Sequence, residues 1–447
     1  MKIRSLLFAG VAPLLAAAVA LLNTIRSSAA EPSRELVPTT VEVPLSLRTT
    51  PFDEDRVLMV PPRFKISVVA RILLARFIMP LSASDFLVAV PGDGSISLVQ
   101  IQADGTATVS SLIEDLHKPH GMALHRTDDK LYLYVAESNE VSRFLIAAGA
   151  ASAGEKAVII PNLPDSSSPG LHGPYGHELK NLVIGPDNKL YVDIASSTNA
   201  DPIDTMSDPV RSAIYQYDLD GGNGRIFARG IRNAEGLAFV PGTNELWAAV
   251  METDDILYPF RNSWQGSGSN DYGNMITSYI DDHPPDEFIH VKDGANYGWP
   301  FANPNPDTSN GLDNMPFAPN YKTNPDWSKY PESMFTRVDK GIQAHSSPLG
   351  IAFLQDSKVP EPFHNGVVLA LHGSFDRSRK TGYKVIFFPW RDGRPGPQID
   401  LVTGWLDDQS QSQWGRPVDV KPANDGSLLI SDDQSGTIYR LAPLGGR

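Results

Sequence analysis

The sequence predicts an all-β protein: a six-bladed β-propeller of four-stranded antiparallel blades, with long loop insertions on one face. The first observation behind this prediction is a unit of two apolar strands joined by a polar turn, which occurs six times at spacings of about 45 to 70 residues. The second is a turn-rich composition, with 36 glycines and 37 prolines among 447 residues, which argues against a helical bundle. A β-sandwich is the alternative, but a sandwich gives no reason for the same loop-then-strand unit to recur along the chain with its residues in the same order.

The six copies of the unit follow one another along the chain. The clearest cover residues 177–194, 232–250 and 415–433, and weaker copies cover 75–99, 119–137 and 346–374. Asp187-Asn188, Gly242-Thr243 and Asp425-Gly426 supply the turns of the clear copies. In a propeller, the residues just before each inner strand surround one mouth of the central channel. We therefore expect the chemistry of a pocket to come from these short segments.

The first thirty residues resemble a secretory signal rather than part of the fold. Lys2 and Arg4 precede an apolar stretch over residues 6–22, and Ser28-Ala29-Ala30 forms a small-residue cleavage site before Glu31. An uncleaved membrane anchor is the alternative. We predict a signal peptide over 1–30, an N-terminal extension over 31–61 and a propeller domain over 62–447. The mature protein is then periplasmic or secreted, without an integral membrane span.

The composition excludes several classes of function. With 38 Lys and Arg against 52 Asp and Glu, the chain carries a formal charge of −14, so we expect no nucleic-acid partner. The absence of cysteine excludes disulfides, iron–sulfur clusters, thiolate zinc sites and cysteine nucleophiles. The chain also lacks a HExxH zinc motif, a phosphate-binding glycine loop in a strand–helix context, and a G-x-S-x-G nucleophile elbow.

The positions before the inner strands are rich in imidazole and guanidinium groups. Read in order, they hold His120, His177, Arg232 with Asn233, His345, the segment His372 to Arg377, and Arg416. In an acidic chain, such a ring predicts an anionic ligand. Each residue taken alone has a structural alternative, since an arginine there can join two blades by an ion pair and a histidine can be a hydrogen-bonded core residue.

Acidic residues gather in two other segments, 251–255 and 281–287. Hard oxygen ligands of this kind suit Ca²⁺, but the spacing is not that of an EF-hand, and a solvated acidic loop is the alternative. About 110 residues separate Arg232 from Ser346, where the regular spacing is lost. We interpret residues 264–271 and 300–330 within this interval as long loops over one face, covering the substrate entrance or only decorating the surface.

Taken in order, these phrases resemble the quinoprotein sugar dehydrogenases, the soluble glucose and sorbosone dehydrogenase family. The resemblance runs from about Pro62 to the C-terminus. It rests on LVIGPDNKLY after His177, RNAEGLAF at Arg232, PPDEFIHVKDGANYGWP at 284–300, HSSPLGIAF at His345, and HGSFDRSRKTGYKV followed by GRPVDV. The last three match the sorbosone dehydrogenase branch best. The family implies a six-bladed propeller that uses pyrroloquinoline quinone and Ca²⁺.

The resemblance also implies roles for single residues. His177 falls on the general base, and Arg232 and Asn233 fall on a cofactor-binding pair. The other implied cofactor contacts are Arg377, Arg416, His345 and His372, and the implied calcium oxygens, largely backbone carbonyls, come from Glu252, Thr253, Asp254 and Asp255. The chain departs from the branch in two places: HGSFDR replaces a tryptophan and asparagine, and METDD replaces an Asn-Glu-Arg-Asp phrase.

These residues suit the oxidation of a sugar. Arginines can meet the carboxylates of the quinone, Ca²⁺ can act as a Lewis acid, and an imidazole can accept a proton near neutral pH. The expected function is therefore a dehydrogenase of an aldose, a sorbosone-like aldehyde or a related sugar, which passes electrons to a quinone or cytochrome c acceptor. A Ca²⁺-dependent propeller lactonase and a non-catalytic exported binding propeller are the alternatives.

Overall fold

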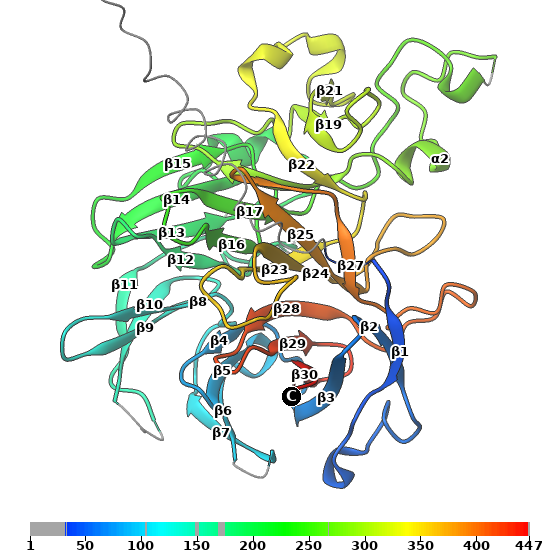
Figure 1. The fold of residues 1–447 in the computed structure, drawn as a ribbon. Coiled ribbons are helices and arrows are strands. Elements are labelled where there is room, and N and C mark those ends of the chain that lie inside the picture. Colours follow the sequence, from blue (N-terminus) through cyan, green and yellow to red (C-terminus); the bar gives the residue numbers. More distant parts are fainter. Residues whose placement is uncertain are drawn as a thin grey trace, which may run out of the picture.

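The computed structural model confirms the predicted fold class. It describes residues 34–445 and residue 32, apart from 103–104, 148–151, 169–174 and 267. Six antiparallel sheets radiate from a common axis (Figure 1). The predicted signal peptide lies outside the described residues. Within them, no helix is both long enough and apolar enough to cross a bilayer.

The first three blades are four-stranded sheets in sequence order, with the first strand of each nearest the axis. Their strands are β4 (Ile78–Pro80), β5 (Asp85–Val90), β6 (Ser95–Ile101) and β7 (Ala107–Ile113); β8 (Met122–Arg126), β9 (Leu131–Ala136), β10 (Val141–Ile146) and β11 (Ala157–Ile160); and β12 (Leu182–Ile184), β13 (Lys189–Ile194), β14 (Ala213–Asp218) and β15 (Arg225–Arg229). The three early copies of the repeat each supply the inner strand and its neighbour.

The fourth and fifth blades carry an additional strand each. The fourth contains β16 (Gly236–Phe239), β17 (Leu246–Val250), β18 (Asp286–Val291), β22 (Val338–Ile342) and, at its edge, β20 (Asp313–Met315). The fifth contains β23 (Pro348–Phe353), β24 (Gly366–Leu371) and β25 (Lys384–Arg391), and β25 pairs with both β26 (Arg394–Pro395) and β27 (Ile399–Val402). The regular four-stranded pattern therefore changes where the chain carries its insertions.

The sixth blade closes the ring with strands from both ends of the domain. It consists of β28 (Pro417–Pro422), β29 (Leu428–Asp432), β30 (Thr437–Pro443) and β3 (Phe64–Arg71). Arg71 reinforces the closure, because its Nε donates to the carbonyl of Gly436 (3.3 Å) and its Nη2 to that of Ser435 (2.8 Å). The preceding hairpin of β1 (Val37–Thr40) and β2 (Val57–Val60) lies outside the ring, bridged to Thr403 through Met59.

The hydrophobic core is divided among the gaps between blades. Within the described residues, six clusters of buried side chains each fill the gap between two neighbouring blades. Strands packed on both faces need apolar residues on both, which explains why all six residues of β24, GVVLAL, are buried. Inner strands also approach closely: a Cβ on Gly236 would lie 2.1 Å from the carbonyl oxygen of Leu349 in the next blade. This close approach explains why the inner strand of the fourth blade begins with glycine.

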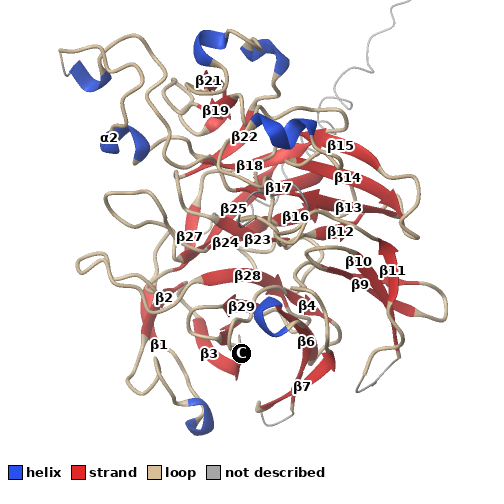
Figure 2. Ribbon diagram, turned by 180° about the vertical axis from the view of Figure 1, so that it is seen from behind, coloured by secondary structure: helices blue, strands red, loops and turns tan. Residues whose placement is uncertain are grey.

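The insertions pack beside the fourth and fifth blades (Figure 2). They reach the face on which the inner strands begin, because the carbonyl of Ile280 contacts His345 just before β23. They contain α2 (Thr277–Ile280) and the hairpin of β19 (Ala302–Pro304) and β21 (Phe317–Pro319). Short 3₁₀ turns occupy Leu45–Leu47, Pro91–Asp93, Pro202–Met206, Trp264–Gly266, Pro325–Trp327 and Glu332–Met334. Ile256, Tyr258, Tyr279 and Ile280 form a small separate core. The predicted loops are thus organised structures with their own packing.

Candidate active site

The residues before the inner strands meet at one end of the channel, which we call the channel mouth. Antiparallel pairing sets the start of each inner strand beside the end of its neighbour, as Pro417 beside Asp432 shows. Arg76 proves that opposite blades come together there. It lies before the first inner strand and contacts groups on the second, fourth and sixth blades.

Arg76 is the centre of a buried ion-pair network. Its guanidinium donates to His120 Nε2 (2.9 Å), to a carboxylate oxygen of Glu235 (2.8 Å) and to one of Asp433 (2.8 Å). Burial and the Arg76 charge lower the pKa of His120 well below its ordinary value, so this imidazole is neutral. His120 therefore has the structural role that the sequence left open as an alternative.

His177 is held as a neutral imidazole, and one of its nitrogens contacts no polar group among the described residues. Its Nδ1 lies 3.0 Å from the carbonyl oxygen of Ser196 and 2.9 Å from Ser196 Oγ. A carbonyl can only accept, so the hydrogen resides on Nδ1 and Nε2 keeps its lone pair. Burial, and then the charge of Arg232, lower the pKa of His177 to about 3. Its Nε2 is thus unprotonated at neutral pH and able to accept a proton.

Arg232 lies beside His177 and is almost fully buried. Its Nη2 donates to Asp254 Oδ2 (3.0 Å) and to Asn199 Oδ1 (2.9 Å). The neighbouring Asn233 is 0% exposed, and its Oδ1 has no hydrogen-bond partner in the part of the chain that the structure describes. A buried acceptor without a donor is costly, so Asn233 indicates a ligand that donates a hydrogen bond here.

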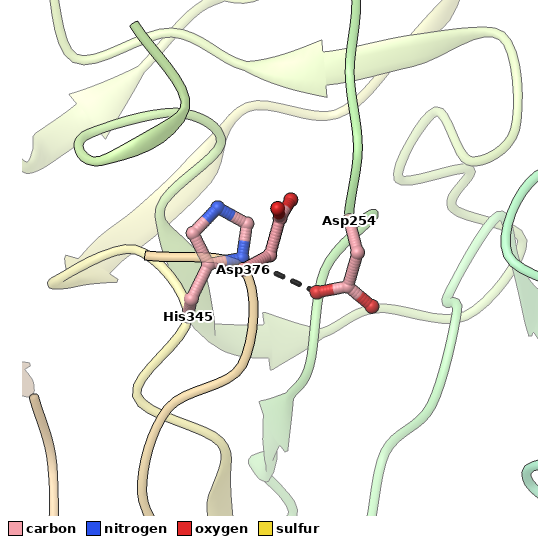
Figure 3. A group of neighbouring side chains, drawn as sticks. All are labelled: Asp254, His345 and Asp376. Atoms are coloured by element: carbon pink, nitrogen blue, oxygen red, sulfur yellow. Dashed lines mark ion pairs between the residues drawn. The ribbon is translucent and has the colours of Figure 1, made fainter. Parts of the chain in front are cut away.

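His345 joins the same site from the loop before β23. Its Nδ1 lies 3.3 Å from Asp254 Oδ1, and its Nε2 contacts the carbonyl oxygens of Ile280 (3.0 Å) and His283 (3.1 Å). Asp376 completes a group of three, since one ligand atom from each of Asp254, His345 and Asp376 lies within 4.8 Å of the other two (Figure 3). Hydrogen bonding to Asp254 and nearby carboxylates raise the pKa of His345, against the effect of burial.

The four residues predicted as calcium ligands divide into two pairs. Glu252 and Thr253 are 3% and 2% exposed, and burial raises the pKa of Glu252 to about 8. The Glu252 carboxyl accepts the Thr253 backbone N–H (3.1 Å), so it faces inward. Asp254 is less buried and the Asp255 N–H donates to Asp376 Oδ2 (2.5 Å). The second pair contacts other polar groups of the mouth directly, Asp254 through Arg232 and Asp255 through Asp376.

The last three predicted cofactor residues come from the fifth and sixth blades. His372 Nε2 lies 2.8 Å from Asp433 Oδ1, and burial lowers its pKa. Arg416 donates from Nε to the carbonyl of His372 (3.1 Å). Arg377 donates from Nη1 to the carbonyl of Ala344 (3.3 Å). Within the described part of the chain, neither of these two guanidinium groups pairs with a carboxylate.

Sequence reasoning missed several residues of this site. Arg76 stands before the inner strand of the 75–99 copy, at the position that identified the other arginines. Applying the same positional rule to this copy would have identified it. Three further polar residues lie inside or just after copies that were recognised by their apolar residues alone: Ser196, Glu235 and Asp433. Asp376 lies within the HGSFDR segment, but nothing in the sequence shows that it meets Asp254.

Fold and site together define a class: a six-bladed propeller whose channel mouth is lined by histidine and arginine around a few carboxylates. The chain belongs to the TrAA12-like family, whose model matches residues 59–443. An uncharacterized protein of Borreliella burgdorferi is 28% identical over 265 residues, which cover 58% of each protein. The chain thus matches little more than half the length of this curated relative.

Solved structures share the fold at low sequence identity. The holo form of the pyranose dehydrogenase PQQ domain from Coprinopsis cinerea has a TM-score of 0.70 at 17% identity, over 86% of this chain and 97% of that one. The calcium structure of the Trichoderma reesei family AA12 enzyme has 0.69 at 18%, with the same coverage. PQQ-bound aldose sugar dehydrogenase from Streptomyces coelicolor has 0.55 at 16%, over 86% and 99%. Nothing in these matches selects the sorbosone branch, which stays a prediction.

Proposed function

We propose that this chain is an exported, periplasmic or secreted quinoprotein dehydrogenase that oxidises an aldose, a sorbosone-like aldehyde or a related sugar. The observation that carries the proposal is the neutral His177 with its free Nε2, set beside the buried Arg232 at the channel mouth. The sugar dehydrogenases among the similar structures support it. A quinone or a cytochrome c would take the electrons.

The donors at the mouth fit pyrroloquinoline quinone, a planar tricarboxylate. Arg377 and Arg416 offer guanidinium groups that form no ion pair with a carboxylate among the described residues, although Asp281 lies near Arg377 and Asp433 near Arg416. Arg232 supplies a third positive charge, shared with Asp254, and Asn233 Oδ1 offers a buried acceptor. His345 and His372 both come from the fifth blade, where the His372 N–H donates to the carbonyl of Ser347 (2.9 Å). When bound, this cofactor would supply the two-electron acceptor, and a divalent cation at Asp254 would polarise it.

The residues of the chain itself perform the proton chemistry. Ser196 fixes the His177 tautomer, so Nε2 presents its lone pair toward the mouth and takes the hydroxyl proton of the substrate. A bound anion beside His177 raises the pKa of the imidazole from its low value, because negative charge stabilises the imidazolium. Without a bound anion, the positive charge of Arg232 keeps the pKa of His177 low. His177 would therefore be a stronger base with the ligand bound than without it.

The test is reconstitution of the purified protein. We expect cofactor and Ca²⁺ to give dye reduction with at least one member of an aldose and aldehyde panel. His177→Gln should keep the fold and the cofactor affinity but lower kcat by about 10² to 10⁴. His364→Gln, a change outside the site, serves as the matched control. Full turnover in His177→Gln would refute the base, and lactone hydrolysis without quinone would instead indicate a lactonase.

A further inference from the structure

The two segments in which this chain departs from the sorbosone dehydrogenase pattern, 251–255 and 372–377, lie in contact with each other. The Asp255 backbone N–H donates to Asp376 Oδ2 (2.5 Å) although the residues stand 121 positions apart. His345 lies between them, 3.3 Å from Asp254. Two unusual segments on different blades therefore bring two carboxylates and an imidazole to one point, which indicates a shared purpose.

The spacing of the three side chains suits a metal ion. Their ligand atoms lie within 4.8 Å of one another (Figure 3). Ligands at about 2.0–2.2 Å from a metal stand roughly 3 to 4.4 Å apart in tetrahedral or octahedral geometry. The measured 3.3 Å between His345 Nδ1 and Asp254 Oδ1 falls inside this interval.

Each side chain is also held by a contact outside the group, and its remaining ligand atom lies toward the other two side chains. His345 Nε2 donates to the carbonyls of Ile280 and His283, so Nδ1 faces the two carboxylates. Asp254 uses Oδ2 for Arg232, which leaves Oδ1. Asp376 uses Oδ2 for the Asp255 amide, which leaves its other oxygen. Outer contacts that orient each ligand are typical of built metal sites.

We propose that Asp254, His345 and Asp376 bind a divalent first-row transition cation through their side chains, in preference to Ca²⁺. Calcium takes oxygen ligands, whereas one imidazole nitrogen with two carboxylates suits Zn²⁺ or Mn²⁺. Three protein ligands leave positions open for water or for a ligand of the mouth. The place of this metal in a reaction rests on the proposed function, but its binding requires neither cofactor nor substrate.

The test is a metal titration of the full chain, without an affinity tag, after removal of metals by a chelator. Calorimetry with ZnCl₂, MnCl₂, CaCl₂ and MgCl₂ should show one Zn²⁺ or Mn²⁺ per chain, bound at least about tenfold more tightly than Ca²⁺. Asp376→Asn and His345→Gln should each weaken that binding by about 10- to 100-fold. Asp408→Asn, an exposed acid outside the group, should leave it unchanged. Circular dichroism checks that each variant is folded.

Two results would overturn the proposal. The first is that Ca²⁺ binds more tightly than both transition metals. The second is that Asp376→Asn binds Zn²⁺ and Mn²⁺ as tightly as the wild type does. These results are independent of the dehydrogenase. A chain that binds Zn²⁺ through Asp376 but never reduces dye would refute the proposed function alone. A chain that turns over sugar with Ca²⁺ and shows no transition-metal site would refute this inference alone.

Discussion

The two ends of the central channel contrast in chemistry although the same six inner strands build both. At the mouth, where these strands begin, Arg76, Glu235 and Asp433 are linked by hydrogen-bonded ion pairs. At the opposite end, Met79, Leu124, Ile184, Phe239 and Phe353 line a mostly apolar cavity of about 440 Å³, in which Lys421 is the one charged lining residue among those described. The difference teaches that the repeat supplies the scaffold at both ends, while the few residues before each strand concentrate charge, and with it chemistry, at one.

The largest expected effect breaks the charged end. Arg76→Met leaves the buried carboxylates of Glu235 and Asp433 without their shared cation, so we expect a loss of about 3 to 5 kcal/mol in the free energy of unfolding. Urea denaturation followed by fluorescence measures it. A loss below about 1 kcal/mol, which is what an exposed ion pair contributes, would show that the network contributes no more than exposed ion pairs do.

The second prediction separates binding from stability at the mouth. Arg416→Ala removes a guanidinium that has backbone carbonyls but no carboxylate as described partners. It should weaken cofactor binding by about 1.5 to 3 kcal/mol, roughly 10- to 150-fold, and leave the empty propeller folded. Fluorescence titration of the stripped protein measures the affinity. The exposed Arg394→Ala is the control, and an unchanged affinity in Arg416→Ala would remove this residue from the site.

The third prediction concerns Asp193, which lies behind the mouth on β13. It is 1% exposed, and neither of its carboxylate oxygens has a hydrogen-bond partner among the described residues. Burial raises the pKa of Asp193 well above the ordinary 3.8. The folded protein therefore keeps a proton that the unfolded chain releases above that value, so stability falls as pH rises from there through the folded pKa.

Asp193→Asn should flatten this dependence and raise the free energy of unfolding by about 1 to 3 kcal/mol at alkaline pH, because it removes the buried charge. Urea curves on the acid and alkaline sides of neutrality give the comparison. At the acid end, where Asp193 is protonated in both states, the two proteins should differ little. A parallel pH dependence in wild type and variant would contradict the assignment.

The smallest effect comes from the apolar end. Ile184 is half-buried in the cavity wall, so Ile184→Ala should cost about 1 to 2 kcal/mol of stability. Cofactor affinity should not change, since the mouth keeps all of its charges. The same denaturation and titration assays apply. A loss of cofactor affinity here would show that the two ends of the channel are coupled, and the contrast between them would fail.

The fold was predictable from sequence because each blade repeats one local phrase. Gly236 in AEGLAF, for example, stands where an inner strand passes its neighbour too closely for a Cβ. Site residues were predictable only where they occupy the fixed position before an inner strand, as Arg232 and Arg416 do. The ion pair of Arg232 with Asp254, the tautomer that Ser196 imposes on His177, and the contact of Asp376 with Asp255 depend on how loops of different blades fold against each other. No spacing in the sequence encodes these contacts.

Ring closure constrains how the molecule can be made. Strand β3 pairs with β30, and Arg71 reaches the carbonyl of Gly436, 365 positions further along the chain. A nascent polypeptide therefore remains an open arc until its final strand has left the ribosome, and until then the inner edge of β3 has no strand to pair with. A premature stop or a proteolytic cut before Thr437 would leave that arc permanently unsealed, however well its other five sheets had formed.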